Sequence, residues 1–390
     1  MVKDEFSFMG KSGEKAIFPT RTRSTNAVLD ALAGVDAEIS VAQLCEITGL
    51  SRPTVMRTVR DLVTAGVATA TTAEQANFAG GRRPQLFKLN RGHHASIVLR
   101  VNYHVMQGLA FDSAGSLLTR TAVKFSKSAK VPWLLREMLA DLLGVVAVPV
   151  YSVAVVVMGI VRHGRVVRSD LVPELDDNQW ISDLDRLLAD SGQECSVVAL
   201  NDAKISAQWM YYAVAQNKPA PESLIAIHCS EDVGCGLVFG GVLLDGAHGA
   251  AGEILQDING PWTPVSKYLR QLEKEYGLPI RNVYKLRARD GGVAKFVEPL
   301  GQLMGKALVP MALTLDPDVI TISGAIVDCG TELIDEIQKV LLAATPTAPE
   351  IRQTPYGAQS VEKGARMFVL KQAREKTLAI SIKNVNKSED

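Results

Sequence analysis

A helix predicted over residues 52–65 carries side chains that can hydrogen-bond to nucleic acid. Thr54, Arg57 and Arg60 lie on the side away from its apolar stripe. Arginine can bind a guanine edge through two hydrogen bonds, and Arg57 points most directly away from the stripe, so it is the candidate for base contact. Ser51 and Arg52 stand at the helix start, where backbone N–H groups also attract phosphate. These residue types predict a surface that reads double-stranded DNA.

A short preceding helix must hold that surface in place. Ser40 and Gln43 fit a capping box at the start of a helix over 41–48, with Leu44 and Ile47 expected inward. Gly49 suits the left-handed residue that ends it, and the next helix follows at once. Two helices joined by such a tight turn predict a helix-turn-helix.

An earlier helix and the apolar stripe complete the three-helix unit. Ser24 or Thr25 can cap a helix that Gly34 ends, and residues 55, 59 and 62 are apolar at i, i+4 and i+7. The alternative is a three-helix protein–protein module whose charged face is merely solvated. The agreement of turn, caps, stripe and basic side chains favours DNA binding.

Two strands, expected over 67–71 and 86–89, flank a loop that ends in GGRRP. Gly81 would let the backbone approach DNA, and Arg82 or Arg83 could enter the narrow minor groove. The formal net charge of the chain is zero, yet residues 51–91 hold seven basic and two acidic side chains. This local excess is the electrostatic pattern expected of a nucleic-acid surface.

Composition points to a multi-domain protein of the cytoplasm. The 390 residues, 47% of them hydrophobic, are enough for two or three domains. Five cysteines without CxxC spacing favour a reduced compartment. The N-terminus lacks the apolar stretch of a signal peptide, and the most apolar run, 145–161, contains Pro149 and is too short to span a bilayer. Residues 1–23 are expected to form a flexible arm, and the polar tail after Lys376 is expected to fray.

From about residue 95 the pattern changes to strands alternating with helices, which predicts an α/β body. Gly240-Gly241 predicts a type I′ hairpin turn. The expected strands are 97–101, 107–111, 152–158, 196–200, 224–228, 236–239 and 319–322, and the expected helices include 133–143, 181–190, 203–215 and 300–314.

Three segments of the chain resemble the ROK family, which joins repressors and sugar kinases. They are the wing sequence GGRRPQLFKLN, the Asn-Asp-Ala stretch at 201–203 and the glycine-rich approach to Glu253. The resemblance covers about residues 20–370. It implies a winged helix-turn-helix followed by a two-lobed, actin-like (ribonuclease H-like) sugar-kinase fold. The implied domains are the winged helix over 24–92, a first α/β lobe over 93–200 with 360–390, and a second lobe over 201–359 for effector binding and oligomerisation.

The resemblance also implies a sugar pocket. In the family's kinases the Asp of Asn-Asp-Ala is the catalytic base and the Asn holds a sugar hydroxyl, which here corresponds to Asp202 and Asn201. Glu253 matches a sugar-binding glutamate, and Lys204 stands where the family often has Asn. Lys204 would neutralise Asp202 or bind an anionic effector. The alternatives are that Asn201 or Asp202 simply caps the helix at Ala203, and that Glu253 is an exposed loop carboxylate.

Departures from the family pattern argue against catalysis and metal binding. Family kinases open their body with Asp-x-Gly-x-Thr, which cradles phosphate, whereas residues 100–104 here read RVNYH. After Glu253 the zinc-binding histidine and cysteine-rich loop are missing. We therefore expect no enzyme activity, no catalytic residue, no cofactor and no metal. A cluster of His228, Cys229 and Cys235 remains an alternative metal site and is interpreted as core packing.

These features predict a homo-oligomeric transcription factor, a dimer or tetramer, that acts as a repressor of carbohydrate genes. Its partners would be a pseudo-palindromic DNA operator and a sugar or sugar-phosphate effector, with no membrane contact. Two alternatives remain. One is a sugar kinase with an accessory DNA-binding domain, and the other is a regulator that senses a partner protein and retains only a vestigial sugar pocket.

Overall fold

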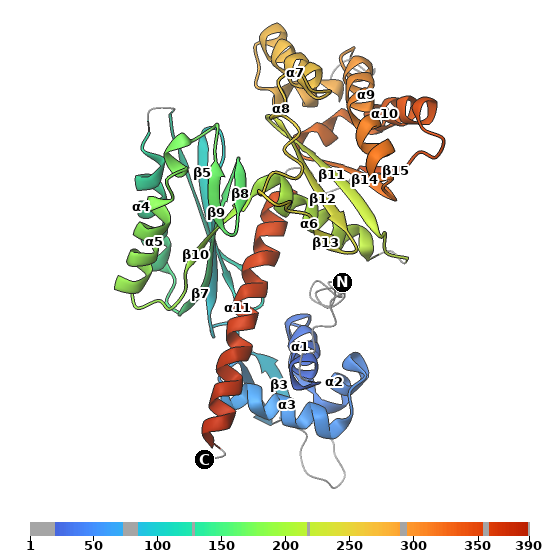
Figure 1. Cartoon of the computed structure of the whole chain (residues 1–390). Coiled ribbons are helices and arrows are strands. Elements are labelled where there is room, and N and C mark those ends of the chain that lie inside the picture. The colour runs from blue at the N-terminus through green and yellow to red at the C-terminus, as the bar shows by residue number, and fades with distance from the viewer. Residues whose placement is uncertain are drawn as a thin grey trace.

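The computed structural model describes residues 20–72, 85–126, 129–216, 219–288, 295–353 and 359–388. It consists of a small N-terminal helical domain, two α/β lobes and a long C-terminal helix that runs from the body to the N-terminal domain (Figure 1). Each lobe is built on its own five-stranded sheet. Within the described residues, no helix is both long enough and apolar enough to cross a membrane.

The N-terminal domain is a winged helix, as expected. Ser40 and Gln43 form the predicted capping box, and Gly49 ends the second helix with a φ of 67°. Its elements are α1 (Thr20–Ala33), β1 (Ile39–Ser40), α2 (Val41–Thr48), α3 (Arg52–Thr64), β2 (Ala68–Thr72) and β3 (Gln85–Leu89), with the three strands in the order β1-β3-β2.

Two local predictions in this domain are wrong. Helix α1 begins at Thr20, inside the predicted arm, so Ser24 is a buried helical residue rather than the cap. Ile47 is 57% exposed. The inward face of α2 continues from Leu44 to Thr48, one full turn later, and Thr48 donates its hydroxyl to the Leu44 carbonyl. Residues 1–19 of the predicted arm lie outside the described residues.

The first lobe has a mixed sheet in the order β10-β7-β4-β5-β6. Strands β4 to β6 form an antiparallel meander, and β7 and β10 add in parallel. A two-stranded ribbon of β8 and β9 follows β7. The elements are β4 (Ala95–Val101), β5 (Val105–Asp112), β6 (Leu117–Lys124), α4 (Val131–Val145), β7 (Val150–Val157), β8 (Ile160–Arg162), β9 (Arg165–Arg168), η1 (Pro173–Leu175), α5 (Gln179–Asp190) and β10 (Val197–Asn201).

The second lobe repeats this plan with the order β13-β12-β11-β14-β15. The predicted Gly240-Gly241 hairpin is confirmed, since both residues have positive φ between β12 and β13. The same strand order in both lobes confirms the expected two-lobed body. The elements are α6 (Asp202–Ala215), β11 (Ser223–Cys229), β12 (Val233–Phe239), β13 (Val242–Leu243), α7 (Thr263–Tyr276), α8 (Ile280–Val283), η2 (Tyr284–Ala288), α9 (Val297–Leu315), β14 (Val319–Ser323), η3 (Ala325–Cys329), α10 (Thr331–Ala344) and β15 (Glu350–Gln353).

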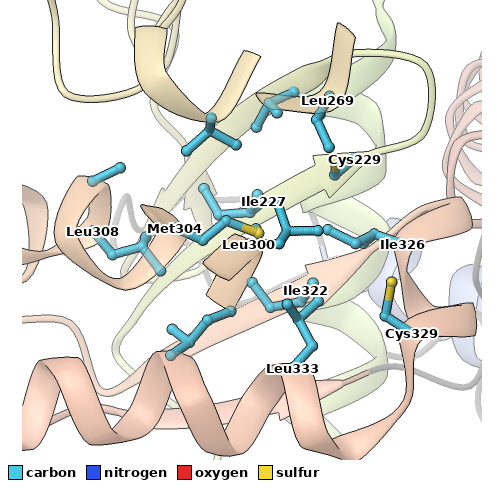
Figure 2. Packing of buried hydrophobic residues seen from close by; sticks show 14 of the residues in the cluster. Ile227, Cys229, Leu269, Leu300, Met304, Leu308, Ile322, Ile326, Cys329 and Leu333 are labelled. Atoms are coloured by element: carbon cyan, nitrogen blue, oxygen red, sulfur yellow. The ribbon is translucent and has the colours of Figure 1, made fainter. Parts of the chain in front are cut away.

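The core of the second lobe lies between its sheet and helices α7, α9 and α10. Figure 2 shows Ile227 and Ile322 of the sheet facing Leu300 and Met304 of α9. Cys229 is fully buried in this cluster, where its thiol contacts the hydroxyl of Tyr284. Burying so much apolar surface makes each lobe a rigid body, so side chains at the sheet ends are held firmly.

The expectation of a frayed tail after Lys376 is wrong. Helix α11 (Gln359–Ser388) continues without interruption for 30 residues. Thr377 and Leu378 are buried, and Leu378 packs into the core of the winged helix. The tail looks polar in sequence because only one stripe of a helix needs apolar residues when it docks against another domain.

Candidate functional sites

Helix α3 presents its polar side to solvent. Val55, Val59 and Leu62 are fully buried against the other helices, which confirms the stripe. Arg57 and Arg60 are exposed on the opposite side. The structure therefore places these two arginines where a duplex could reach them.

The start of α3 is also accessible. Ser51 and Arg52 are exposed, and Thr54 is partly buried. Ser51 occupies the cap position, but its side chain does not bond to the backbone there. Its hydroxyl instead lies 2.8 Å from the hydroxyl of Thr54. The hydroxyl groups and the uncapped N–H groups beside them can donate hydrogen bonds to a phosphate oxygen.

The basic excess around α3 is reduced by one residue. Arg91 forms ion pairs with Asp36 of the winged helix and with Asp112 of β5, so it joins the domain to the body. Gly81, Arg82 and Arg83 of the predicted wing tip lie outside the described residues. Strands β2 and β3, which lead into and out of the tip, are paired in register from Ala68↔Leu89 to Thr72↔Gln85.

A cavity of about 160 Å³ lies between the two lobes. The ends of β4, β7 and β10 border it on one side and the β11–β12 turn on the other. In mixed α/β folds, ligands bind beyond the strand ends because loops there can converge without interrupting the sheet. Its polar lining includes Arg100, Tyr103, Asp170, Asn201, Asp202, His228, Glu231, Asp232 and Glu253.

Three of the four expected effector residues meet in this cavity. Asn201 donates its side-chain amide to the carbonyl of Gly159 at 2.7 Å and to Glu253 Oε1 at 3.4 Å. Its Oδ1 accepts from the N–H of Lys204 and caps α6. The prediction that Asn201 caps the helix is confirmed, and the same side chain lines the cavity. Glu253 is partly buried against the cavity, so the reading of an exposed loop carboxylate is wrong.

Burial changes the protonation of the two carboxyl groups. Burial raises the pKa of Glu253 to about 7, and Lys204 partly offsets this effect. Burial raises the pKa of Asp202 to about 6 against the opposing charge of Arg100. Near neutral pH each group exchanges between the acid and the carboxylate. The carboxylate can accept hydrogen bonds from hydroxyl groups, and the acid can also donate one.

Lys204 was predicted to neutralise Asp202 or to bind an anionic effector, but its ammonium group lies elsewhere. Its ammonium donates to the carbonyl of Gly249 at 2.7 Å and pairs with Asp245 at 3.3 Å. It does not border the cavity. Lys204 therefore fastens the glycine-rich segment that carries Glu253. The positive φ of Gly249 and Gly252 and the backbone packed against them leave no room for a Cβ there.

The charge beside Asp202 comes from Arg100. Leu99 and Val101 point into the core of the first lobe, so Arg100 points to the other face, toward α6 and α11. Tyr103, in the β4–β5 turn, donates its hydroxyl to Asp232 Oδ2 of the β11–β12 turn at 3.3 Å. A bulky side chain thus links the two lobes at this turn.

The sequence reading missed the contribution of the β11–β12 turn. Ser230, Glu231 and Asp232 follow a buried strand directly, which is the position where ligand-binding side chains gather in such folds. That signal was present in the sequence. The contribution of Asp170 was not detectable, because it depends on how the segment after β9 folds back toward Gln256.

His228 connects the cavity wall to α11. Its Nδ1 lies 3.1 Å from the hydroxyl of Ser323 and 3.4 Å from that of Ser360, at the start of α11. Ser360 also accepts a 2.8 Å hydrogen bond from Ser206 of α6. Burial lowers the pKa of His228 to about 3, so the ring is neutral. The alternative metal site is not assembled among the described residues, since His228 bonds to serines and Cys229 to Tyr284.

Comparison with known proteins identifies two matching families. The MarR family model matches residues 22–76, and the ROK family model matches residues 99–255. No curated protein sequence matches the chain significantly.

Solved structures match at low identity. A ROK family transcriptional regulator, described as a homolog of the E. coli MLC protein, is 17% identical with a TM-score of 0.66, covering 93% of this chain and all of its own. A ROK hexokinase from Thermus thermophilus is 18% identical with a TM-score of 0.52, covering 72% of this chain and 99% of its own. A ROK family glucokinase from Streptomyces griseus, solved with glucose and AMPPNP, is 17% identical with a TM-score of 0.52, covering 71% and 99%.

The matches to the two kinases cover 72% and 71% of this chain, whereas the match to the regulator covers 93% of it. The strand order, the paired lobes and the family matches agree. The chain therefore combines a MarR-type winged helix with a ROK-family domain of sugar-kinase-like fold.

Proposed function

We propose that the protein is a sequence-specific DNA-binding transcriptional regulator of the cytoplasm, acting as a repressor of carbohydrate genes. The observation that carries this proposal is the exposed face of α3, with Arg57 and Arg60 outward and a fully buried stripe behind them. Ser51, Arg52 and Thr54 would contact phosphate or bases at the helix start, and Gly81, Arg82 and Arg83 would contact the adjacent groove. Two copies in a homodimer, or four in a tetramer, would read a two-fold symmetric operator.

The effector would be a sugar or sugar derivative held between the lobes. Asn201, Asp202 and Glu253 offer one amide and two carboxyl groups within a single cavity, the chemistry that sugar hydroxyls require. An effector that prefers one spacing of the lobes would shift the equilibrium between two states of the body. Helix α11 touches both the cavity wall at His228 and the winged helix, so it offers a route for that shift.

We propose further that the body is not a kinase. The partly buried Arg100 near Asp202 and the Tyr103–Asp232 link would obstruct the entry of a nucleotide phosphate and its metal between the lobes. A positive guanidinium repels a divalent cation, and Asp202 is held near that guanidinium instead. Release of ADP from ATP in the presence of hexoses, above a protein-free blank, would contradict this proposal.

Selection of DNA sites by the purified full-length protein tests the proposed regulator. We expect an enriched sequence with two-fold related half-sites, and weaker binding to it when a pool of sugars and sugar phosphates is added. If no sequence is enriched, the N-terminal domain is better explained as a module that binds another protein. Enrichment without any response to the pool would favour a regulator that senses a partner protein.

A further inference from the structure

A second cavity of about 270 Å³ adjoins the first one and differs from it in charge. The two share Arg100, Asn102, Tyr103, Ser230 and Glu231 in their walls, so Arg100 stands at their boundary. Beyond that boundary all the carboxyl groups of the first cavity, Asp170, Asp202, Asp232 and Glu253, stand without a basic residue other than the neutral His228. The second adds Arg281 and His104 and no further carboxylate.

The side chain of Arg100 is partly buried and lines both cavities. Within the part of the chain that the structure describes, no hydrogen bond or ion pair reaches it, although Asp202, Glu231 and Glu362 favour its charge from a distance. A guanidinium group carries five N–H donors, and those of Arg100 are available to an acceptor that enters the cavities.

The acidic groups near Arg100 already have other partners. Asp202 accepts from the N–H of Ala203, and Glu362 pairs with Arg120 at 2.6 Å. Glu231 pairs with Arg281 at 3.3 Å. Each carboxylate is therefore engaged elsewhere, and the donors of Arg100 remain open toward the boundary of the two cavities.

We infer that Arg100 binds an anionic oxygen group of the effector, a carboxylate or a phosphate, and that Arg281, while paired with Glu231, adds positive charge to the same cavity. The planar fork of arginine matches such groups through two parallel hydrogen bonds. The hydroxyl groups of the same ligand face Asn201, Asp202 and Glu253 in the acidic cavity. This inference rests on the proposed effector cavity. It assigns anion binding to Arg100 in place of Lys204, whose ammonium group already contacts Gly249 and Asp245.

Calorimetric and thermal-shift titrations of the full-length protein at constant ionic strength test the inference. The probes are glucuronate, glucose 6-phosphate, inorganic phosphate and, as a neutral control, glucose. We expect at least one anionic probe to bind saturably. Arg100→Met should weaken that binding about tenfold or more, Arg100→Lys should retain part of it, and Arg281→Met should have a smaller effect.

Arg186→Met is the matched control, because it removes an arginine from an exposed ion pair on α5, outside both cavities. If Arg100→Met fails to fold, as judged by circular dichroism, Arg100→Lys and Arg281→Met carry the test. Glucuronate binding without phosphate binding identifies a carboxylate ligand, and binding of glucose 6-phosphate over glucuronate identifies a phosphorylated one.

Two results overturn the inference: no anionic probe binds, or Arg100→Met binds them as the wild type does. Glucose binding without anion binding removes the anion subsite and leaves the proposed sugar effector standing. Binding of inorganic phosphate that Arg100→Met abolishes, without any response to the three sugars, supports the subsite and contradicts the proposed sugar effector.

Discussion

Arg374 of α11 forms an ion pair with Asp30 of α1, with 2.6 Å between Nη1 and Oδ1. Its Nη2 also donates to the carbonyl of Asn26 at 2.9 Å. Residues 344 positions apart in sequence thus join the last helix of the chain to the first helix of the winged domain. Because α11 begins at the His228–Ser360 contact beside the cavity, one helix touches both the wall of the cavity and the winged domain.

We expect the Arg374–Asp30 pair to couple the winged domain to the body. In a double-mutant cycle of Arg374→Met and Asp30→Asn, the coupling energy should be about 1–2 kcal/mol, since both side chains are largely buried. Hydrogen exchange in α1 measures the opening of the domain. Lys371→Met, which removes a cation from the same helix, is the control, and additive effects of the two substitutions would contradict the coupling.

Arg57→Ala should weaken binding to the selected operator by about 1–3 kcal/mol and relax the preference at one base position, because a base contact carries both affinity and specificity. Equilibrium titration against operator variants measures both quantities. Arg136→Ala, on the exposed surface of α4, is the matched control. Unchanged affinity in Arg57→Ala would mean that another face of the domain meets DNA.

Arg82→Ala and Arg83→Ala should lower affinity for all sequences and reduce the slope of log affinity against log salt by about 1 each. A contact to phosphate releases counterions, whereas a contact to a base edge need not do so. Titrations at several salt concentrations measure the slope. A loss of preference at one base position without a change in slope would instead assign a base contact to the wing.

The contribution of Glu253 and Asp202 to the free energy of unfolding should fall as pH rises from about 5 to 7, whereas the burial of neutral His228 acts in the opposite direction. Glu253 and Asp202 have pKa values raised by burial to about 7 and about 6, so the folded state holds protons that the unfolded chain releases. Their stabilising contribution is complete below the unfolded pKa and is lost as pH rises through the folded one, by at most about 1.4 kcal/mol per pH unit for each group.

Urea unfolding at a series of pH values measures the contribution of Glu253 as the difference in stability between the wild type and Glu253→Gln, which should fall as pH rises from 5 to 7. The amide keeps the size of the side chain and removes the titration. A Glu253→Gln variant with the full wild-type slope would show that Glu253 titrates in its ordinary range.

Much of the winged helix was predictable because its signals are local. The Ser40–Gln43 box, Gly49 and the Val55 stripe each depend on residues within one or two helical turns. Ile47 was assigned to the wrong face because an eight-residue helix offers too few positions to define its inward side. In the body, the strand pattern and the glycine-rich segment indicated the fold and the position of Glu253.

The sequence by itself determined the order of the domains and the outward face of α3. Only the tertiary structure decided the partners of the charged groups. Lys204 donates a hydrogen bond to the carbonyl of Gly249, and Tyr103 donates one to Asp232. Arg374 forms an ion pair with Asp30. The physical reason is that capping and periodicity act between near neighbours in the chain. Charge pairing across lobes depends instead on which buried surfaces meet, and no local pattern contains that information.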